Sequence, residues 1–401
     1  MNTIKKAAGV LAGVVALALI LLVAAGGCVG SGTGVSQDLQ APADGKDQAP
    51  LPTEALPAPT PDETQVEEGY ALPAIVPAEA PGQETMTRAF PTKFEKKTYT
   101  IEIDVNGSVY DGARNVDRRW PVSASWDDPA VMTAYYRRYI EDPAMEVFFD
   151  DLTRPFRYIK AADGLNDEEY LELLITFVQQ IPYDADAPSE PRYPVEVIGN
   201  MKGDCDEKSL LLLGMLAHEG YDTALLLFPG EHHAAAGIGI TVNGNPSFRV
   251  FESTDRGKYF YIESTGPTYI GRYTEPFGSA EAKVVPLGDG TKRFDRVNYV
   301  TRITGIYQKI DDRLPFMNAR MEEWRGEIED LKESLTHGTY ETREEWDRDH
   351  REYTDLIMQH NDYVQKFNRY IEVRAYIADH PYDMAGVYRY IQNSNVEDIT
   401  I

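Results

Sequence analysis

The feature that most limits what this chain can fold into is an uninterrupted run of apolar and small residues near its amino end. Residues 7–27 contain no charged side chain and follow Lys5 and Lys6. A run of this length can span a bilayer as a helix, and the same pattern is typical of a signal peptide. We therefore assign residues 1–28 to a signal peptide or membrane anchor and expect the body of the protein on the extracytoplasmic side of a cell membrane.

The run ends at Cys28, which follows the small residues Ala-Ala-Gly-Gly. Small residues before a cysteine resemble a lipoprotein processing site, where the cysteine becomes the lipidated first residue. The alternative is a simple membrane anchor that contains a cysteine. Both interpretations tether the protein to the membrane.

A segment without hydrophobic periodicity follows, over residues 29–92. Ten of the 25 prolines lie between Pro42 and Pro91, among many Ala, Gly, Gln, Asp and Glu residues. Such a segment buries too little apolar surface to offset the entropy of ordering it. The composition predicts a disordered, acidic linker.

Charge and cysteine content exclude several classes of protein. Asp and Glu number 65 against 39 Lys and Arg, so the formal net charge is −26, and no local basic patch is present. A phosphate backbone is repelled by such a surface, so we expect no nucleic-acid partner. Two cysteines exclude a disulfide-dense scaffold and a cysteine-rich zinc site, and nothing in the chain predicts a cofactor.

Residues 93–305 combine helical and strand patterns. Residues 99–105 alternate apolar and polar side chains and end at Asn106-Gly107, which predicts a strand followed by a turn. Asn166 and Gly220 have the positions of an N-cap and a C′ glycine for two of the expected helices. We expect helices over 129–139, 167–181 and about 204–219, and strands over 224–228, 234–242, 248–251 and 259–262. Helices followed by antiparallel strands indicate an α+β domain.

Residues 306–380 carry a heptad pattern in two halves. Apolar residues from Met317 to Leu335 step alternately by four and three, and Gly338 then interrupts the seam. Thr342 and Glu345 predict the capping box of a second helix, so we expect an antiparallel hairpin that packs on the α+β domain or projects as an arm for a protein partner. Residues 381–401 then form a tail with a short helix. His350 and His360 fall beside the seam, where a metal role is not expected.

Cys205 is the candidate for chemistry. It lies in the stretch Gly-Asp-Cys-Asp-Glu-Lys-Ser, residues 203–209, where the predicted helix begins. Amide groups at a helix start favour a thiolate, whereas acidic neighbours would oppose it if they pointed at the sulfur. A nucleophilic thiol needs a base, for which His232 and His233 are candidates, and an acid that orients the base. Glu252, Asp255 and Glu263 are the candidate acids, with Glu263 at the expected end of a buried strand.

Several of these stretches together resemble the transglutaminase-like superfamily, in particular its exported prokaryotic branch. Residues 193–197 and 203–209 resemble the cysteine region, and residues 177–183 with Asp186 resemble the helix and turn that precede it. Residues 233–237 resemble the histidine strand and residues 261–267 the third strand of the site. The resemblance covers roughly residues 93–271, less than half of the chain.

The resemblance implies a papain-like α+β fold with a catalytic triad. Matched position by position, Cys205 is the nucleophile, His233 the base and Glu263 the orienting acid, where many members have Asp. The loop at residues 200–202, with the Cys205 N–H, is a candidate oxyanion hole. The expected activity is acyl transfer from a peptide or carboxamide bond of a protein or peptide, either to water or to an amine.

Two alternatives stay open from the sequence. The first is a non-catalytic, membrane-tethered scaffold that uses the helical hairpin to bind a protein partner. The second is a metal site built from Glu231, His232, His233 and an acid from Asp255 or Glu263. Neighbouring residues of a strand point to opposite faces, so both histidines cannot easily reach one ion, and we expect no metal.

Overall fold

The computed structural model describes residues 73–79, 84–120, 125, 128–241, 249–254, 256–273, 277, 279–394 and 396. The apolar run, Cys28 and most of the predicted linker lie outside these residues. Among the helices that it does describe, none combines the length and apolar character needed to cross a bilayer.

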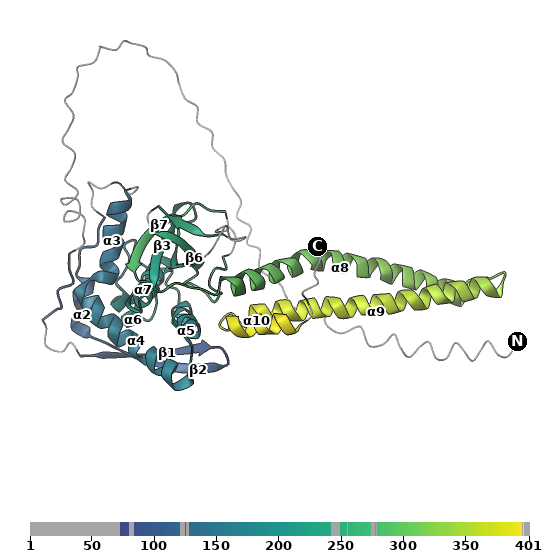
Figure 1. The fold of residues 1–401 in the computed structure, drawn as a ribbon, viewed down its shortest axis with the longest axis horizontal. Helices are drawn as coiled ribbons and strands as arrows, with labels where there is room; N and C mark the ends of the chain where they lie inside the picture. The colour runs from purple at the N-terminus through teal and green to yellow at the C-terminus, as the bar shows by residue number, and fades with distance from the viewer. Residues whose placement is uncertain are drawn as a thin grey trace, which may run out of the picture. The chain divides into compact units, whose positions relative to one another are not determined.

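The described part is an α+β structure with antiparallel sheets and a helical carboxyl-terminal region, as the order of the predicted elements indicates (Figure 1). In chain order the elements are β1 (Met86–Phe94), β2 (Lys97–Val105), α2 (Gly107–Arg114), α3 (Pro129–Glu141), α4 (Pro143–Asp163), α5 (Asp167–Gln180), α6 (Pro194–Asn200), α7 (Cys205–His218), β3 (Asp222–Phe228), the 3-10 helix η4 (Pro229–Glu231), β4 (His233–Gly239), β5 (Phe251–Ser253), β6 (Gly257–Ile262), β7 (Lys283–Asp289), α8 (Val297–His337), α9 (Arg343–Asp379) and α10 (Met384–Asn393).

The first two strands form a separate hairpin. β1 and β2 pair antiparallel from Met86 opposite Val105 to Phe94 opposite Lys97, and alternate side chains of both strands are buried. Ile75 is buried as well, and its N–H donates to Asp142 Oδ2 at 2.9 Å. The folded body therefore starts before residue 93, inside the range that the sequence assigns to the linker.

Asn106 ends β2 in a different way from the one predicted. The Asn-Gly pair suggests a turn, but the Asn106 side chain accepts hydrogen bonds from the N–H groups of Ser108 and Val109 and caps helix α2. Asn is favoured both in turns and at N-caps, so the dipeptide alone does not separate the two structures.

The main sheet has five antiparallel strands in the order β5-β6-β4-β3-β7. The four strands expected from the sequence are present, although β5 starts only at Phe251. β7, which pairs with β3 at the edge of the sheet, is not among the predicted elements. The sheet is thus one strand wider than the sequence patterns indicate.

The two faces of the sheet belong to different parts of the core. Leu225 and Leu227 of β3 pack into the main core with helix α7, which lies against the sheet (Figure 1). Leu226 and Phe228 face the other way and join a smaller cluster with Ala235 and Tyr261. This alternation fixes which side chains of β4 and β6 face the helix and which face away from it.

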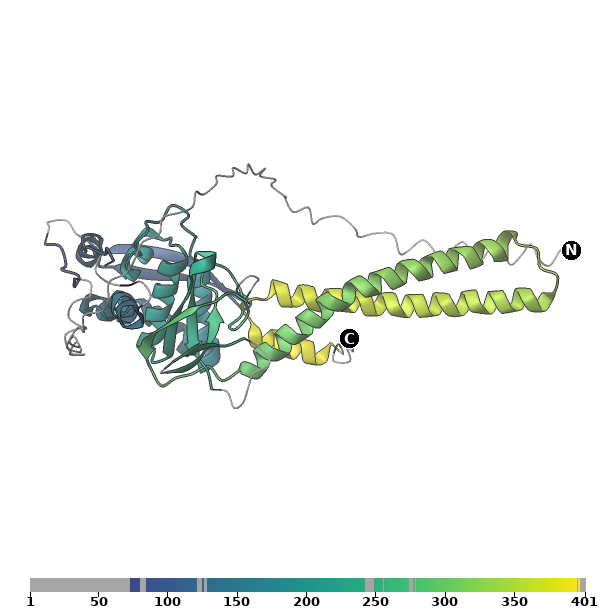
Figure 2. The same ribbon diagram turned by 90° about the horizontal axis from the view of Figure 1, so that it is seen from above.

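Helices α8 and α9 form the predicted antiparallel hairpin and run side by side in both views (Figure 2). The Thr342–Glu345 capping box is present at the start of α9. Trp324 meets Tyr363 across the hairpin, with ring centroids 5.2 Å apart. α8 begins at Val297, so its first turns belong to the range 93–305 that the sequence assigns to the preceding domain.

The open end of the hairpin packs on the α+β core. The Tyr269 hydroxyl lies 2.8 Å from the carbonyl oxygen of Ile377 and 2.5 Å from that of His380, at the end of α9, and its one proton is directed at this pair of acceptors. The buried Glu172 of α5 accepts from the N–H of Met384 at the start of α10. Helix α10 lies in the predicted tail and completes this contact.

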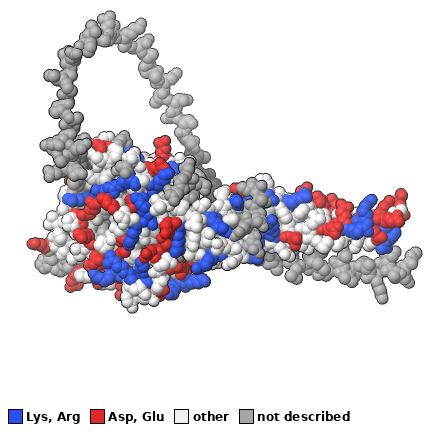
Figure 3. Space-filling model, in the orientation of Figure 1, with Lys and Arg blue, Asp and Glu red and all other residues white. Residues whose placement is uncertain are grey.

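Charge is mixed along the described surface. On the face drawn in Figure 3, Lys and Arg side chains alternate with Asp and Glu side chains over both the core and the hairpin. Many of these groups pair within one helix, as Arg325 does with Glu322. No continuous basic area appears among the described residues of this face.

Candidate functional site

Cys205 is the first residue of α7, and its thiol is free and half-buried. The loop before it turns at Met201, which has a positive φ of 57°, an uncommon conformation for a residue with a side chain. Asp204 then caps the helix, and its side chain and that of Glu207 form a capping box. These contacts fix the thiol at the amino end of the helix, where the helix dipole favours a negative charge.

The acidic neighbours of Cys205 do not all act on the thiol. Glu207 is buried and accepts from Arg192, with Nε–Oε1 at 2.6 Å and Nη2–Oε2 at 2.7 Å. Arg192 also pairs with the buried Asp184 at 2.7 Å. Burial, together with the adjacent Asp204, raises the pKa of Asp206 well above its usual range, which favours the neutral acid. Glu207 and Asp206 therefore act less strongly against a thiolate at Cys205 than two free carboxylates would.

His233 is the first residue of β4, opposite Phe228 of β3. It follows His232, whose φ of 50° is again in the left-handed region and redirects the chain from the 3-10 helix into the strand. Non-glycine residues in this region cost energy and occur often at functional sites. The His233 ring stacks on Phe277 with centroids 4.5 Å apart, while His232 is exposed.

Glu263 directly follows β6 and faces the imidazole. Its Oε2 lies 3.3 Å from His233 Nε2, and it accepts from the Tyr261 hydroxyl at 2.5 Å. Its Oε1 accepts from the N–H of Thr265 at 2.9 Å and from the Thr265 hydroxyl at 2.7 Å. Both carboxylate oxygens are thus held in place within one short stretch of chain.

The charge states of this group favour an ion pair. Burial acts against a charge on His233, but the Cys205 hydrogen bond and then Glu263 outweigh it and raise the pKa of His233 to about 9. Burial would raise the pKa of Glu263, but hydrogen bonds from His233, Tyr261 and Thr265 lower it to about 2. The structure therefore brings Cys205, His233 and Glu263 together with the histidine in its charged form near neutral pH.

Buried polar contacts connect the elements that carry these three residues. Ser209 of α7 and Ser264 are both fully buried, with their hydroxyl oxygens 2.9 Å apart, and Ser264 reaches the carbonyl of Cys205 at 3.4 Å. Lys208, also fully buried, donates to the carbonyls of Gln179 at 3.3 Å and Ile181 at 2.7 Å. The Gln179 amide donates in turn to the carbonyl of Glu263 at 2.9 Å.

The other candidates from the sequence lie apart from this group. Glu252 is largely exposed and pairs with Lys258, and Asp255 is outside the described residues. Lys202, from the loop considered as an oxyanion hole, pairs with Asp184 at 3.0 Å. Asp184 takes part in the buried pairing beside the cysteine loop, whereas Asp186 is exposed. In the part of the chain that the structure describes, no group of three or more His, Cys, Asp or Glu residues could hold a metal ion.

Sequence reasoning did not single out Tyr261, Lys208 or Ser264. Tyr261 is two residues before Glu263, so strand alternation puts both on one face, and that spacing could have suggested a contact. Lys208 and Ser264 could not have been found in this way, because their partners come from distant parts of the chain.

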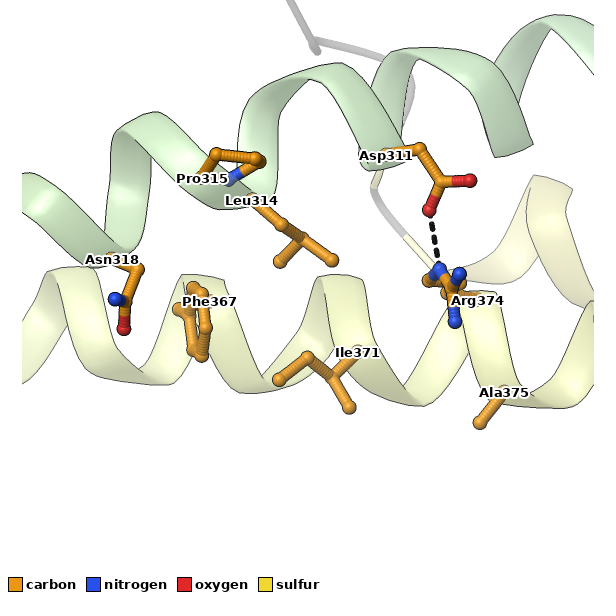
Figure 4. Close-up of a pocket in the computed structure, with 8 residues that line it drawn as sticks. All are labelled: Asp311, Leu314, Pro315, Asn318, Phe367, Ile371, Arg374 and Ala375. Atoms are coloured by element: carbon orange, nitrogen blue, oxygen red, sulfur yellow. Dashed lines mark hydrogen bonds and ion pairs between the residues drawn. The ribbon is translucent and has the colours of Figure 1, made fainter. Parts of the chain in front are cut away.

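A cavity of about 540 Å³ lies elsewhere, between α8 and α9 (Figure 4). Its lining is mainly apolar, with an ion pair between Asp311 and Arg374 at one end. The lining residues are Asp311, Leu314, Pro315, Asn318, Phe367, Ile371, Arg374 and Ala375. None of them belongs to the group around Cys205, and the cavity offers no nucleophile and base in contact.

Comparisons with protein-family models, with curated proteins and with solved structures give no match to this chain.

Proposed function

We propose that this protein is a cysteine-dependent acyl-transfer enzyme with a papain-like, transglutaminase-like core. Cys205 is the nucleophile, His233 the general base and Glu263 the acid that orients it. The observation that carries the proposal is the 3.3 Å contact of His233 Nε2 with Glu263, on a histidine whose pKa is also raised by a hydrogen bond with Cys205. A nucleophile, a base and an orienting acid in this order are the parts that thiol catalysis requires.

The first step follows from the way the imidazole is held. Glu263 and Tyr261 both lie at Nε2, so Nε2 carries a proton and Nδ1 is the nitrogen left for the thiol. With His233 charged, Nδ1 already holds the proton given up by the Cys205 thiol, and the thiolate attacks the carbonyl carbon of a peptide or carboxamide. The tetrahedral intermediate collapses to a thioester when His233 returns the proton to the leaving amine.

The second step restores the enzyme. Water or a primary amine loses a proton to His233 and attacks the thioester, and the Cys205 thiolate leaves. Water gives a peptidase or amidase and an amine gives a cross-linking transferase. The N–H of Cys205, at the first position of α7, has no acceptor among the described residues, and it is available to the oxyanion in both steps.

The substrate approaches beside Tyr183. This side chain is 54% exposed, and its backbone pairs with Gly203, two residues before Cys205. An exposed aromatic ring next to the nucleophile suits a peptide or protein substrate better than a small ion. The amino-terminal run and linker would present such a site outside the membrane to which the chain is tethered.

The test is alkylation of Cys205 by iodoacetamide in the full chain at pH 6, followed by mass spectrometry of the peptide that contains Cys205. An ordinary thiol is only about 0.3% thiolate at this pH. We expect the His233→Ala variant to react up to about 100-fold more slowly than the wild type, and Glu263→Gln to be intermediate. His232→Ala and Glu252→Gln are the matched controls, because both residues are exposed neighbours.

Equal rates for the wild type, His233→Ala and Glu263→Gln would contradict the triad and favour the alternative of a non-catalytic scaffold. If the triad is upheld, glutamine-containing peptides distinguish the two reactions. Ammonia release without uptake of a labelled primary amine indicates hydrolysis, and uptake of the amine indicates transfer.

A further inference from the structure

Three polar groups meet at the side of His233 away from the thiol. The Tyr261 hydroxyl lies 2.5 Å from Glu263 Oε2 and 3.2 Å from His233 Nε2, and Nε2 lies 3.3 Å from the same Oε2. A charge-assisted N–H···O bond is normally about 2.7–2.9 Å long. The direct contact between the imidazole and the carboxylate is therefore long, whereas the contact between the tyrosine and the carboxylate is short.

The protons in this triangle can be assigned from the chemistry of each group. An ionised carboxylate accepts only, and a phenol has one proton to donate and lone pairs that accept. Burial first, and then the charge of Glu263, raise the pKa of Tyr261, so the phenol keeps its proton. The hydroxyl donates to Glu263, and its oxygen accepts from the Nε2–H of His233.

The hydrogen-bond partners of the Tyr261 hydroxyl are His233 and Glu263. Tyr261 is fully buried, and its ring lies in the smaller cluster with Phe228 and Phe251. Its partner position in β4 is Gly237, so no side chain of β4 occupies the space directly opposite. The other titratable groups that act here are Cys205 from α7 and Lys208, whose charge acts on Glu263.

We propose that Tyr261 is a positioning residue, whose hydroxyl bridges Glu263 and His233 and holds the imidazole with Nε2–H toward the acid and Nδ1 toward Cys205. The carboxylate lies 3.3 Å from Nε2, which is long for a charge-assisted hydrogen bond, and the hydroxyl links the two groups. The site is thus a tetrad in which the orienting function is divided between a carboxylate and a phenol. This inference rests on the proposed thiol nucleophile and adds a fourth side chain to it.

The test compares Tyr261→Phe with Tyr259→Phe in the full chain. Tyr259 is on the same strand, is equally buried and donates its hydroxyl to Asp222 at 3.0 Å, away from the site. Each variant loses one buried hydroxyl and one hydrogen bond to a carboxylate. The readout is the rate of Cys205 alkylation by iodoacetamide as a function of pH, with thermal unfolding measured alongside.

For Tyr261→Phe we expect about a tenfold lower rate on the acidic side of the profile and a half-maximal pH about one unit higher, since the imidazolium loses its nearest acceptor. Tyr259→Phe is expected to keep the wild-type profile. In a Glu263→Gln background, Tyr261→Phe is expected to add little, because the hydroxyl acts through the carboxylate.

Three outcomes overturn the inference. A wild-type profile in Tyr261→Phe, while His233→Ala is slow, removes the role of Tyr261 and leaves the proposed function intact. The same shift in both tyrosine variants shows a general loss of packing. A wild-type Cys205 that reacts no faster than an ordinary thiol, with no effect of His233→Ala, removes the proposed function and this inference together.

Discussion

The hydroxyl oxygens of Ser209 and Ser264 lie 2.9 Å apart, and neither side chain is exposed to solvent. Ser209 also reaches the carbonyl of Ala234, next to His233, and Ser264 reaches the carbonyl of Cys205. This pair joins the three chain segments that carry the candidate nucleophile, base and acid. It is the shortest connection between α7 and the end of β6 among the described side-chain contacts.

Replacing Ser264 by alanine should therefore affect both stability and the site. We expect Ser264→Ala to lower the free energy of unfolding by about 1 kcal/mol, because Ser209 loses its buried partner. Urea titration measures this change. Ser334→Ala is the control, since it also breaks a contact between two hydroxyl groups, 3.2 Å from Tyr340 in the hairpin. Slower alkylation of Cys205 is expected only for Ser264→Ala, and equal alkylation rates in both variants would contradict a role at the site.

The titration of His233 gives a prediction with a definite sign. Cys205 and Glu263 raise its pKa to about 9 against the effect of burial, so the ring stays protonated through neutral pH. In an NMR spectrum, the imidazole signal of His233 is the one that disappears in a His233→Asn variant. We expect a midpoint near pH 9 in the wild type and a lower one in Cys205→Ala and in Glu263→Gln. A midpoint near 6.5 in all three proteins would show that neither neighbour stabilises the charge.

Stability should depend on pH through the same histidine. A folded-state pKa above the unfolded value of 6.5 means that the folded protein binds the proton more tightly. The contribution of His233 is fully present below pH 6.5 and is lost as the pH rises through 9. We expect wild type and His233→Ala to differ in free energy of unfolding at pH 6 and to approach each other above pH 9, as measured by urea titration. A difference that does not change with pH would contradict this linkage.

The contribution of Lys208 to stability changes with pH in the opposite direction to that of His233. Burial lowers its pKa from 10.5 to about 8, against the opposing charge of Glu263, so the unfolded chain binds more protons between these two pH values. Its contribution to stability should rise with pH from 8 to 10.5. We expect the wild type to gain stability relative to Lys208→Met over this range. The partly exposed Lys258, in a Lys258→Met variant, serves as the control, and the idea fails if both variants follow the wild type in parallel.

Arg192 is expected to be the most sensitive charged residue near the cysteine loop. It pairs with two buried carboxylates, Glu207 and Asp184. Removing one partner of a buried pair leaves an uncompensated charge, so Arg192→Ala should cost about 3 kcal/mol in free energy of unfolding. The exposed pair of Arg119 with Asp117 is the contrast, where Arg119→Ala should leave the free energy of unfolding almost unchanged. Similar losses in both variants, by chemical denaturation, would contradict the assignment.

Local signals in the sequence predicted much of the fold. Asn166 caps α5 one residue before its start, as expected, and the Thr342–Glu345 capping box begins α9. Capping depends on residues within one helical turn, so it can be recognised without the tertiary structure. Cys205, His233 and Glu263 were also named from the sequence: their places at the ends of expected elements made them candidates, and the family resemblance chose His233 over His232 and Glu263 among the acids.

Non-local contacts account for what the sequence did not reveal. Acidic neighbours oppose a thiolate only where they point at the sulfur, and Glu207 instead pairs with Arg192, fifteen positions earlier in the chain. β7 was missed because only its pairing with β3 makes it a strand. The burial of Lys208 depends on the end of α5, nearly thirty positions away. A local sequence pattern does not indicate contacts between residues this far apart in the chain.

The contacts at the open end of the hairpin have a consequence for how the chain can be divided. Tyr269 is bonded to the end of α9 and Glu172 to the start of α10, and Glu172 is on the same helix as Gln179, which holds the Glu263 carbonyl. A chain shortened after residue 305 would lose the acceptors of Tyr269 and expose a buried carboxyl group. The heptad region is therefore a separate stretch of sequence that shares buried polar contacts with the core, and we expect the core to lose stability when this region is removed.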